Sequence, residues 1–187
     1  HLSDIKKNNF VNIDLVIVNF YPFEKTLEQT NNHQKIIENI DVGGPTMVRA
    51  AAKNYNDVTV ITSIDQYSEL INELRNNKGC TTLKFREKMS RLAFGETAYY
   101  DALISNYFNK FNNINFPKRK ILYTNLIENL RYGENPHQIA AFYSQNLQNK
   151  LKQIHGKTLS YNNYSDIFAA LTISKSLPKN TGTVIVK

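Results

Sequence analysis

The sequence predicts an α/β protein built in two parts. Two short apolar runs, 13–18 and 58–62, each lead into a polar loop, and an alanine-rich segment of good helix propensity, 46–54, lies between them. Apolar runs of this length are typical of buried parallel strands, and the order strand, helix, strand is that of a parallel sheet. In such sheets, ligands bind at the loops that follow the strands.

Local signals support the helices of this first part. Pro45 suits the first position of the helix that follows it. Ser63 and Gln66 form a capping box for a helix that Gly79 can end. Apolar and aromatic residues recur at helical spacing over 82–111, which predicts one long helix or two shorter ones. We interpret their aromatic stripe as core or subunit interface, not as a cofactor site.

A second pattern begins after an asparagine-rich segment. Residues 112–120 contain Pro117 and three basic residues, which is typical of a linker, so we expect one domain over 1–115 and another over 116–187. The second domain is predicted to contain, in order, a strand over 121–130, a polar turn at 131–138, a short apolar run at 139–143, a helix over about 165–176 and a final strand at 183–186.

Composition excludes several classes of protein. The chain has 187 residues, of which 41% are hydrophobic and 21% charged, as in an ordinary folded protein. Its single cysteine, Cys80, supports neither a disulfide framework nor a cysteine-based metal site, and it favours a reducing, cytoplasmic location. We see no signal peptide, and the best apolar run, 15–18, is too short to span a bilayer. We therefore expect no metal and no membrane partner.

The net charge of +7 raises the question of nucleic-acid binding. The basic residues are spread along the chain, however. The densest group, Lys118 to Lys120, lacks the stacking motif of single-strand binders, so we interpret it as a solvated linker and expect no nucleic-acid partner. A positive field still attracts small phosphorylated substrates.

Two clusters of residues could carry chemistry. Asp41, Val42 and Gly43 precede a helix whose free N–H groups attract anions, and Lys53 on that helix could be a proton carrier or a solvated lysine. In the second part, Arg131, Tyr132, Asn135 and His137 crowd one turn, and the forked Arg131 suits carboxylate or phosphate. Such turns, like the pair Asn162 and Asn163, can equally serve only to satisfy their own backbone.

A resemblance to a known family favours a functional role for both clusters. The segments 18–23, 40–54 and 97–101 resemble the cyclohydrolase half of the bifunctional purine-biosynthesis family that combines AICAR transformylase with IMP cyclohydrolase. The segments 130–138, 156–163 with Asp166, and 184–187 resemble the opening of its transformylase half. The matches are in order and cover nearly the whole chain. Phe20 stands where the family usually has leucine.

The resemblance implies a methylglyoxal-synthase-like domain with a nucleotide site. Its lining would include Val18 and Asn19 together with Asp41, Val42 and Gly43, and its catalytic positions would be Tyr21, Asp41 and Lys53. The reaction implied is ring closure of formyl-AICAR to IMP with loss of water. This chemistry needs a donor to the developing oxyanion and groups that carry protons.

The resemblance also implies the start of a cytidine-deaminase-like transformylase domain. Arg131 and Tyr132 fall on positions that bind AICAR, and we place Asn162 and Asn163 among the substrate-binding candidates. His137 would support formyl transfer, and Lys187 matches the lysine of a Lys-His pair whose histidine would come next. The cosubstrate would be 10-formyltetrahydrofolate, bound by residues outside this chain. The parent enzyme would be a cytosolic homodimer.

The chain begins without methionine and stops directly after a strand-like run, so we expect it to be a segment of a longer enzyme. We expect this segment by itself to have neither activity. Two alternatives stay open at this point. One is a nucleotide- or RNA-binding module with the same fold and no catalysis. The other is an enzyme with only one of the two activities.

Overall fold

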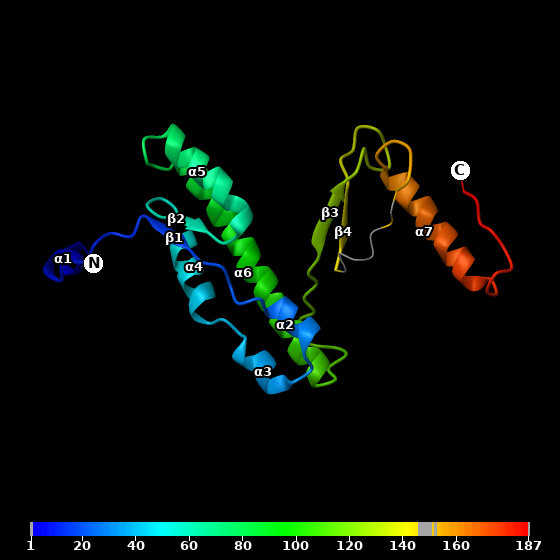
Figure 1. Ribbon diagram of the computed structural model, residues 1–187, viewed down its shortest axis with the longest axis horizontal. Helices are drawn as coiled ribbons and strands as arrows, with labels where there is room; N and C mark the ends of the chain where they lie inside the picture. The colour runs from blue at the N-terminus through cyan, green and yellow to red at the C-terminus, as the bar shows by residue number, and fades with distance from the viewer. Residues whose placement is uncertain (1, 146–150, 152, 187) are drawn as a thin grey trace. The chain divides into compact units, whose positions relative to one another are not determined.

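The chain forms two compact units that divide between Leu122 and Tyr123. A computed structural model describes residues 2–145, 151 and 153–186. Figure 1 gives the order of helices and strands along the chain. None of the helices in this described part is long and apolar enough to cross a membrane.

A parallel pair of strands organises the first unit. Strand β1 (Leu15–Ile17) pairs with β2 (Thr59–Ile61), and Leu15 lies opposite Thr59. Three helices join the strands: α2 (Phe23–Gln29), α3 (His33–Glu38) and α4 (Gly43–Lys53). The mixed α/β fold with a parallel pair is therefore confirmed. Because parallel strands run in one direction, the loops that follow β1 and β2 lie at the same edge of the sheet.

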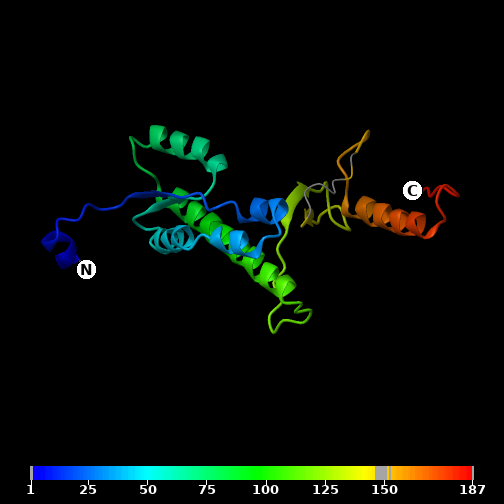
Figure 2. The same ribbon diagram turned by 60° about the horizontal axis from the view of Figure 1, so that its bottom comes forward.

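The core of this unit lies around β2. The helix α1 (Leu2–Lys7) precedes the sheet, and a short 3-10 helix, η1 (Ile64–Gln66), then α5 (Tyr67–Asn76) and α6 (Leu83–Phe111) follow it. Figure 2 shows the long α6 running past the strands and α4. All three β2 residues are buried against side chains of α4, α5 and α6, which include Val48, Ala52, Leu70, Phe85 and Met89.

The predicted helix signals act as expected. Ser63 and Gln66 form the capping box that starts η1. Gly79 adopts a φ of 84°, and its N–H donates to the Leu74 carbonyl at 2.8 Å, which ends α5. Residues 83–111 form one helix rather than two. Pro45, in contrast, occupies the third position of α4, where a missing N–H still costs no helical hydrogen bond.

The prediction that β1 is buried was wrong. Leu15 and Ile17 are 38% and 46% exposed, and only Val16 between them is half-buried. Val16 packs against the core, whereas Leu15 and Ile17 point to the opposite face of the strand, which stays exposed in the described residues. An apolar run alone does not distinguish a strand with two covered faces from a strand with one.

The second unit combines a hairpin with one helix. Strands β3 (Asn125–Asn129) and β4 (Ala141–Ser144) are antiparallel, with an irregularity between Leu126 and Glu128. Helix α7 (Tyr161–Ser176) places the ring of Tyr164 on that of Phe142, with centroids 4.6 Å apart.

Three predictions for this unit need correction. Strand β3 covers only part of 121–130. Helix α7 begins at Tyr161 instead of about residue 165, because Ser160 and Asn163 form a capping box ahead of it. The apolar run 183–186 is not a strand in the described structure. Its residues have β-branched side chains, but a strand also needs a hydrogen-bonded neighbour.

Candidate small-molecule sites in the two units

The first candidate site lies where β1 and β2 end. The pairing continues past β1, since the Val18 N–H donates to the Ile61 carbonyl at 3.0 Å. The next side chain, that of Asn19, donates to the Tyr67 hydroxyl at 3.1 Å. A cavity of about 410 Å³ opens beside these loops; its lining includes Asn19, Tyr21, Thr62, Ser63, Asp65, Glu96, Tyr99 and Tyr100.

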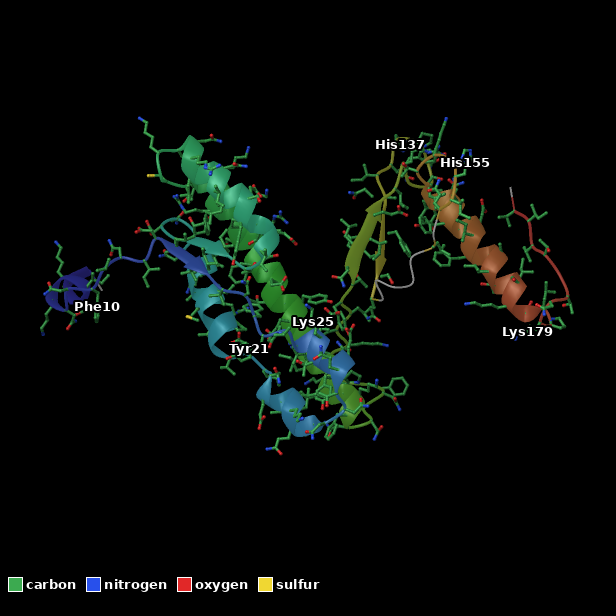
Figure 3. All side chains as sticks on the ribbon, viewed as in Figure 1. Phe10, Tyr21, Lys25, His137, His155 and Lys179 are labelled. Carbon is green, nitrogen blue, oxygen red and sulfur yellow. The ribbon has the colours of Figure 1, made fainter. Side chains whose placement is uncertain are left out.

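Tyr21 and Asp41 are brought together from two different loops. The Asp41 carboxylate accepts hydrogen bonds from the backbone N–H of Gly44 at 2.8 Å and from that of Tyr21 at 3.4 Å. Asp41 therefore caps the start of α4 and also holds the loop after β1. Figure 3 labels Tyr21 on this loop, and its side chain is 56% exposed, so the phenol can reach a ligand.

The remaining predicted lining residues are neighbours of Tyr21 or Asp41 along the chain. Val42 and Gly43 follow Asp41 directly, and both are exposed at the start of α4. Val18 is half-buried and Asn19 exposed at the end of β1. The contact between Tyr21 and Asp41 thus links the two predicted stretches of lining residues into one edge of the unit.

Lys53 is not brought to this edge. It is the last residue of α4, whereas Asp41 precedes the first turn. Lys53 comes ten positions after Gly43 in the helix, which corresponds to about 15 Å along the axis. The Lys53 side chain is exposed.

The charged residues that line the cavity are all acidic. They are Glu24, Asp65 and Glu96. The Tyr99 hydroxyl donates to the Glu24 carboxylate at 3.0 Å. The Glu96 side chain is exposed, but the protein atoms around its carboxyl, and secondarily the charge of Glu24, raise its pKa. The carboxylates of these three residues attract N–H groups of a ligand and repel a phosphate group.

Several of these lining residues were not predicted from the sequence. The β2 loop, Thr62 to Asp65, was interpreted only as a helix cap, although the rule that ligands bind after parallel strands points to it. Glu96, Tyr99 and Tyr100 belong to the aromatic region of α6 that we interpreted as core. Tyr67 had no signal in the sequence.

The second candidate site joins the two motif segments of the second unit. The Arg131 N–H donates to the Leu159 carbonyl at 2.9 Å, and the Tyr161 N–H donates to the Tyr132 carbonyl at 3.1 Å. These bonds tie the turn after β3 to the start of α7. Gly133 is needed there, since a Cβ would lie 2.8 Å from that of Gln138.

Arg131 and Tyr132 form a cationic, aromatic surface. The Arg131 guanidinium lies 4.8 Å from the centroid of the Tyr132 ring, and one of its nitrogens donates to the Tyr132 hydroxyl at 3.1 Å. Arg131 is exposed, so other N–H groups of its fork can bind an anion. His137 is exposed on the same turn, as Figure 3 shows.

Asn162 and Asn163 have backbone partners. The Asn162 amide donates to the Glu134 carbonyl at 3.1 Å. The Asn163 side chain accepts from the N–H and the hydroxyl of Ser160, both at 3.0 Å. Both asparagines therefore hold the loop and helix start beside Arg131 and Tyr132. Lys187 lies outside the described residues.

Within the described part of the chain, no group of three or more His, Cys, Asp or Glu residues is arranged to hold a metal ion. Cys80 is an exposed free thiol. The polar groups of both sites are hydroxyls, amides, carboxylates and one guanidinium, which suit an organic ligand with hydrogen-bonding groups.

The fold is that of a mixed α/β protein, with one candidate small-molecule site in each unit. The family model described as the AICARFT/IMPCHase bienzyme matches residues 51–187. The chain belongs to this family.

Curated relatives and one solved structure agree. The chain is 46% identical over 174 residues to the bifunctional purine biosynthesis protein PurH of Bradyrhizobium diazoefficiens, which covers 91% of this chain and 33% of the relative. It is 41% identical over 191 residues to PurH of Oceanobacillus iheyensis, with 99% and 37% covered. The crystal structure of ForH is similar with a TM-score of 0.50 and 27% identity, over 58% of this chain and 56% of ForH. The chain thus spans about a third of the length of these curated relatives.

Proposed function

We propose that the full-length protein catalyses the last two steps of purine biosynthesis: formyl transfer from 10-formyltetrahydrofolate to AICAR, and ring closure of formyl-AICAR to IMP. The observation that carries the proposal is family membership together with the separation of the two motif groups into two compact units. A methylglyoxal-synthase-like cyclohydrolase domain would extend over 1–115, inside the first unit. A cytidine-deaminase-like transformylase domain would begin at residue 116 and include the second unit.

Ring closure moves protons at three atoms. The carboxamide nitrogen attacks the formyl carbon and loses one proton. The formamide nitrogen loses a second proton as the ring C=N bond forms, and the formyl oxygen takes up two protons and leaves as water. The exposed phenol of Tyr21 is suited to donate to that oxygen. Asp41 holds the Tyr21 loop through the backbone, and each carboxylate oxygen can accept a further bond from the substrate amide. The proton-carrier role of Lys53 rests on the resemblance alone.

The acidic cavity suggests how the nucleotide is oriented. Glu24, Asp65 and Glu96 would accept hydrogen bonds from the N–H groups of the carboxamide and formamide. A phosphate near the same carboxylates would be repelled, because like charges in a partly desolvated site are costly. We therefore propose that the base end enters this cavity, with the phosphate outside it. Val18, Asn19, Val42 and Gly43 would border the rest of the nucleotide.

Formyl transfer needs a base and an oxyanion stabiliser. The AICAR amine attacks the formyl carbon, loses a proton, and the folate nitrogen leaves with a proton. Arg131, held over Tyr132, is suited to bind the AICAR phosphate or carboxamide oxygen. His137 and Lys187 would support the transfer itself. Asn162 and Asn163 would contribute by fixing the loop beside Arg131.

We further propose that the protein acts in the cytoplasm as a homodimer on small-molecule nucleotides. The similarity to proteins named as bifunctional biosynthesis proteins does not favour a non-catalytic nucleotide- or RNA-binding module. The most basic stretch, Lys118 to Lys120, is exposed on the segment that leads out of the first unit, as expected for a solvated linker.

The experiment supplies full-length protein with AICAR and 10-formyltetrahydrofolate, and separately with formyl-AICAR. IMP should form in both reactions, and the absence of product from both would contradict the proposal. Lys53→Ala tests the weakest assignment: we expect turnover in ring closure to fall more than about tenfold, with nucleotide affinity changed by less than about threefold. Turnover within about twofold of wild type would remove Lys53 from the catalytic residues. RNA binding with a steep salt dependence and no turnover would favour the binding module.

A further inference from the structure

Tyr100 of α6 lies beneath both loops of the first candidate site. Its side chain is only 4% exposed. The ring packs against Phe20, with centroids 5.1 Å apart, and against Phe23 at 6.0 Å. Both phenylalanines flank Tyr21, so the Tyr100 ring supports the loop after β1 from inside the unit.

The Tyr100 hydroxyl also holds the segment that contains Asp41, just before α4. It accepts a hydrogen bond from the Asp41 N–H at 2.8 Å and donates to the Asn39 carbonyl at 3.4 Å. Burial raises the pKa of the phenol, and the negative charges of Asp41 and Asp101 act in the same direction, although the bond from the Asp41 N–H opposes them. The hydroxyl therefore keeps its proton at neutral pH and serves both partners at once.

We propose that Tyr100 is a positioning residue for the ring-closure site, acting through Asp41. The proposal rests on the proposed function of the first unit. One buried side chain supports the loop of Tyr21 by ring packing and fixes Asp41 by its hydroxyl. Asp41 in turn bonds to Gly44 and Tyr21. The backbone of Asp41 is thus held by the Tyr100 hydroxyl, and its carboxylate by two backbone N–H groups.

Removing only the hydroxyl should disturb Asp41 without removing the ring. In Tyr100→Phe the packing against Phe20 is retained, but the Asp41 N–H loses its partner in a partly buried position. Small displacements of a group that acts in the transition state are costly to turnover. We expect kcat for ring closure to fall about tenfold or more, with KM within about threefold of wild type.

The test uses full-length protein, formyl-AICAR and four variants. Tyr107→Phe is the matched control, because it removes another tyrosine hydroxyl of α6, one bonded to His33 at 2.7 Å and absent from the lining of the cavity. It should keep kcat within about twofold. Asp41→Asn and Tyr100→Phe are combined to test whether they act as one unit. The double variant should lose no more than Asp41→Asn alone; losses that multiply, or kcat unchanged in Tyr100→Phe, would overturn the proposal.

Amide hydrogen exchange tests whether Tyr100 holds the Asp41 segment, independently of any catalytic activity. Exchange over 39–44 should be faster in Tyr100→Phe and unchanged in Tyr107→Phe. Unchanged exchange in both variants would show that Tyr100 does not fix Asp41. If the wild type does not close formyl-AICAR, the proposed function fails, yet the exchange result still decides whether Tyr100 holds this loop.

Discussion

The carboxylate of Asp41 occupies the space that a side chain on Gly44 would need. A Cβ at Gly44 would lie 2.5 Å from Asp41 Oδ2, although the Gly44 N–H donates to the other carboxylate oxygen at 2.8 Å. Glycine is therefore required at this position by the close approach of Asp41, and not by an unusual backbone angle.

Gly44→Ala should displace the Asp41 carboxylate. The helical position favours alanine by up to about 1 kcal/mol, but the clash and the lost cap should outweigh it, so we expect a net loss of about 1–2 kcal/mol of stability. Gly95→Ala is the control, since Gly95 lies inside α6 with nothing within 4 Å of a Cβ. It should raise stability by about 0.5–1 kcal/mol. Urea unfolding of the full-length variants measures both changes in the free energy of unfolding. An equal increase in Gly44→Ala and Gly95→Ala would contradict the close contact between Gly44 and Asp41.

The second unit contains a buried tyrosine with a specific pH signature. Tyr164 donates to the Glu128 carboxylate, and burial, then this hydrogen bond and the charge of Glu128, raise the pKa of Tyr164 to about 12. An unfolded tyrosine ionises near pH 10, at about the usual value. The stabilisation by Tyr164 is therefore complete below about pH 10 and is lost as pH rises from there through about 12.

Phenolate absorbance tests this prediction. The titration of Tyr164→Phe is subtracted from that of the wild type, and the difference should have its midpoint near pH 12. Tyr161→Phe provides the matched subtraction, because it removes a tyrosine of the same helix that is 51% exposed. A Tyr164 difference with its midpoint near about pH 10 would show that the contact with Glu128 does not raise the pKa.

Features carried by local chemistry could be predicted from the sequence. The parallel strands, the capping box at Ser63 and the end of α5 at Gly79 follow from residue patterns within a few positions. The capping box at Ser160 was missed because asparagine takes the place of the usual Glu or Gln at its third position.

Features that depend on distant contacts could not be predicted. The bond between Asp41 and Tyr100 joins residues 59 positions apart, and nothing local distinguishes Tyr100 from the other aromatic residues of α6. The exposure of β1 likewise depends on which elements cover the sheet. The resemblance supplied the candidate site residues, but it could not supply the hydrogen bonds that hold them in place.

In our proposal, ring closure takes place in the first unit and formyl transfer in the second. Arg131→Ala removes the guanidinium but keeps the backbone bond to Leu159 that fixes the turn. It should lower formyl transfer by about a hundredfold or more, as expected when an anion-binding contact is lost, while ring closure stays within about twofold.

The most direct measurement is therefore a pair of assays on Arg131→Ala and Asp41→Asn in the full-length protein, one with AICAR and 10-formyltetrahydrofolate and one with formyl-AICAR. We expect opposite patterns: Arg131→Ala loses formyl transfer only, and Asp41→Asn loses ring closure only. Equal loss of both activities in either variant would contradict the assignment of one reaction to each unit.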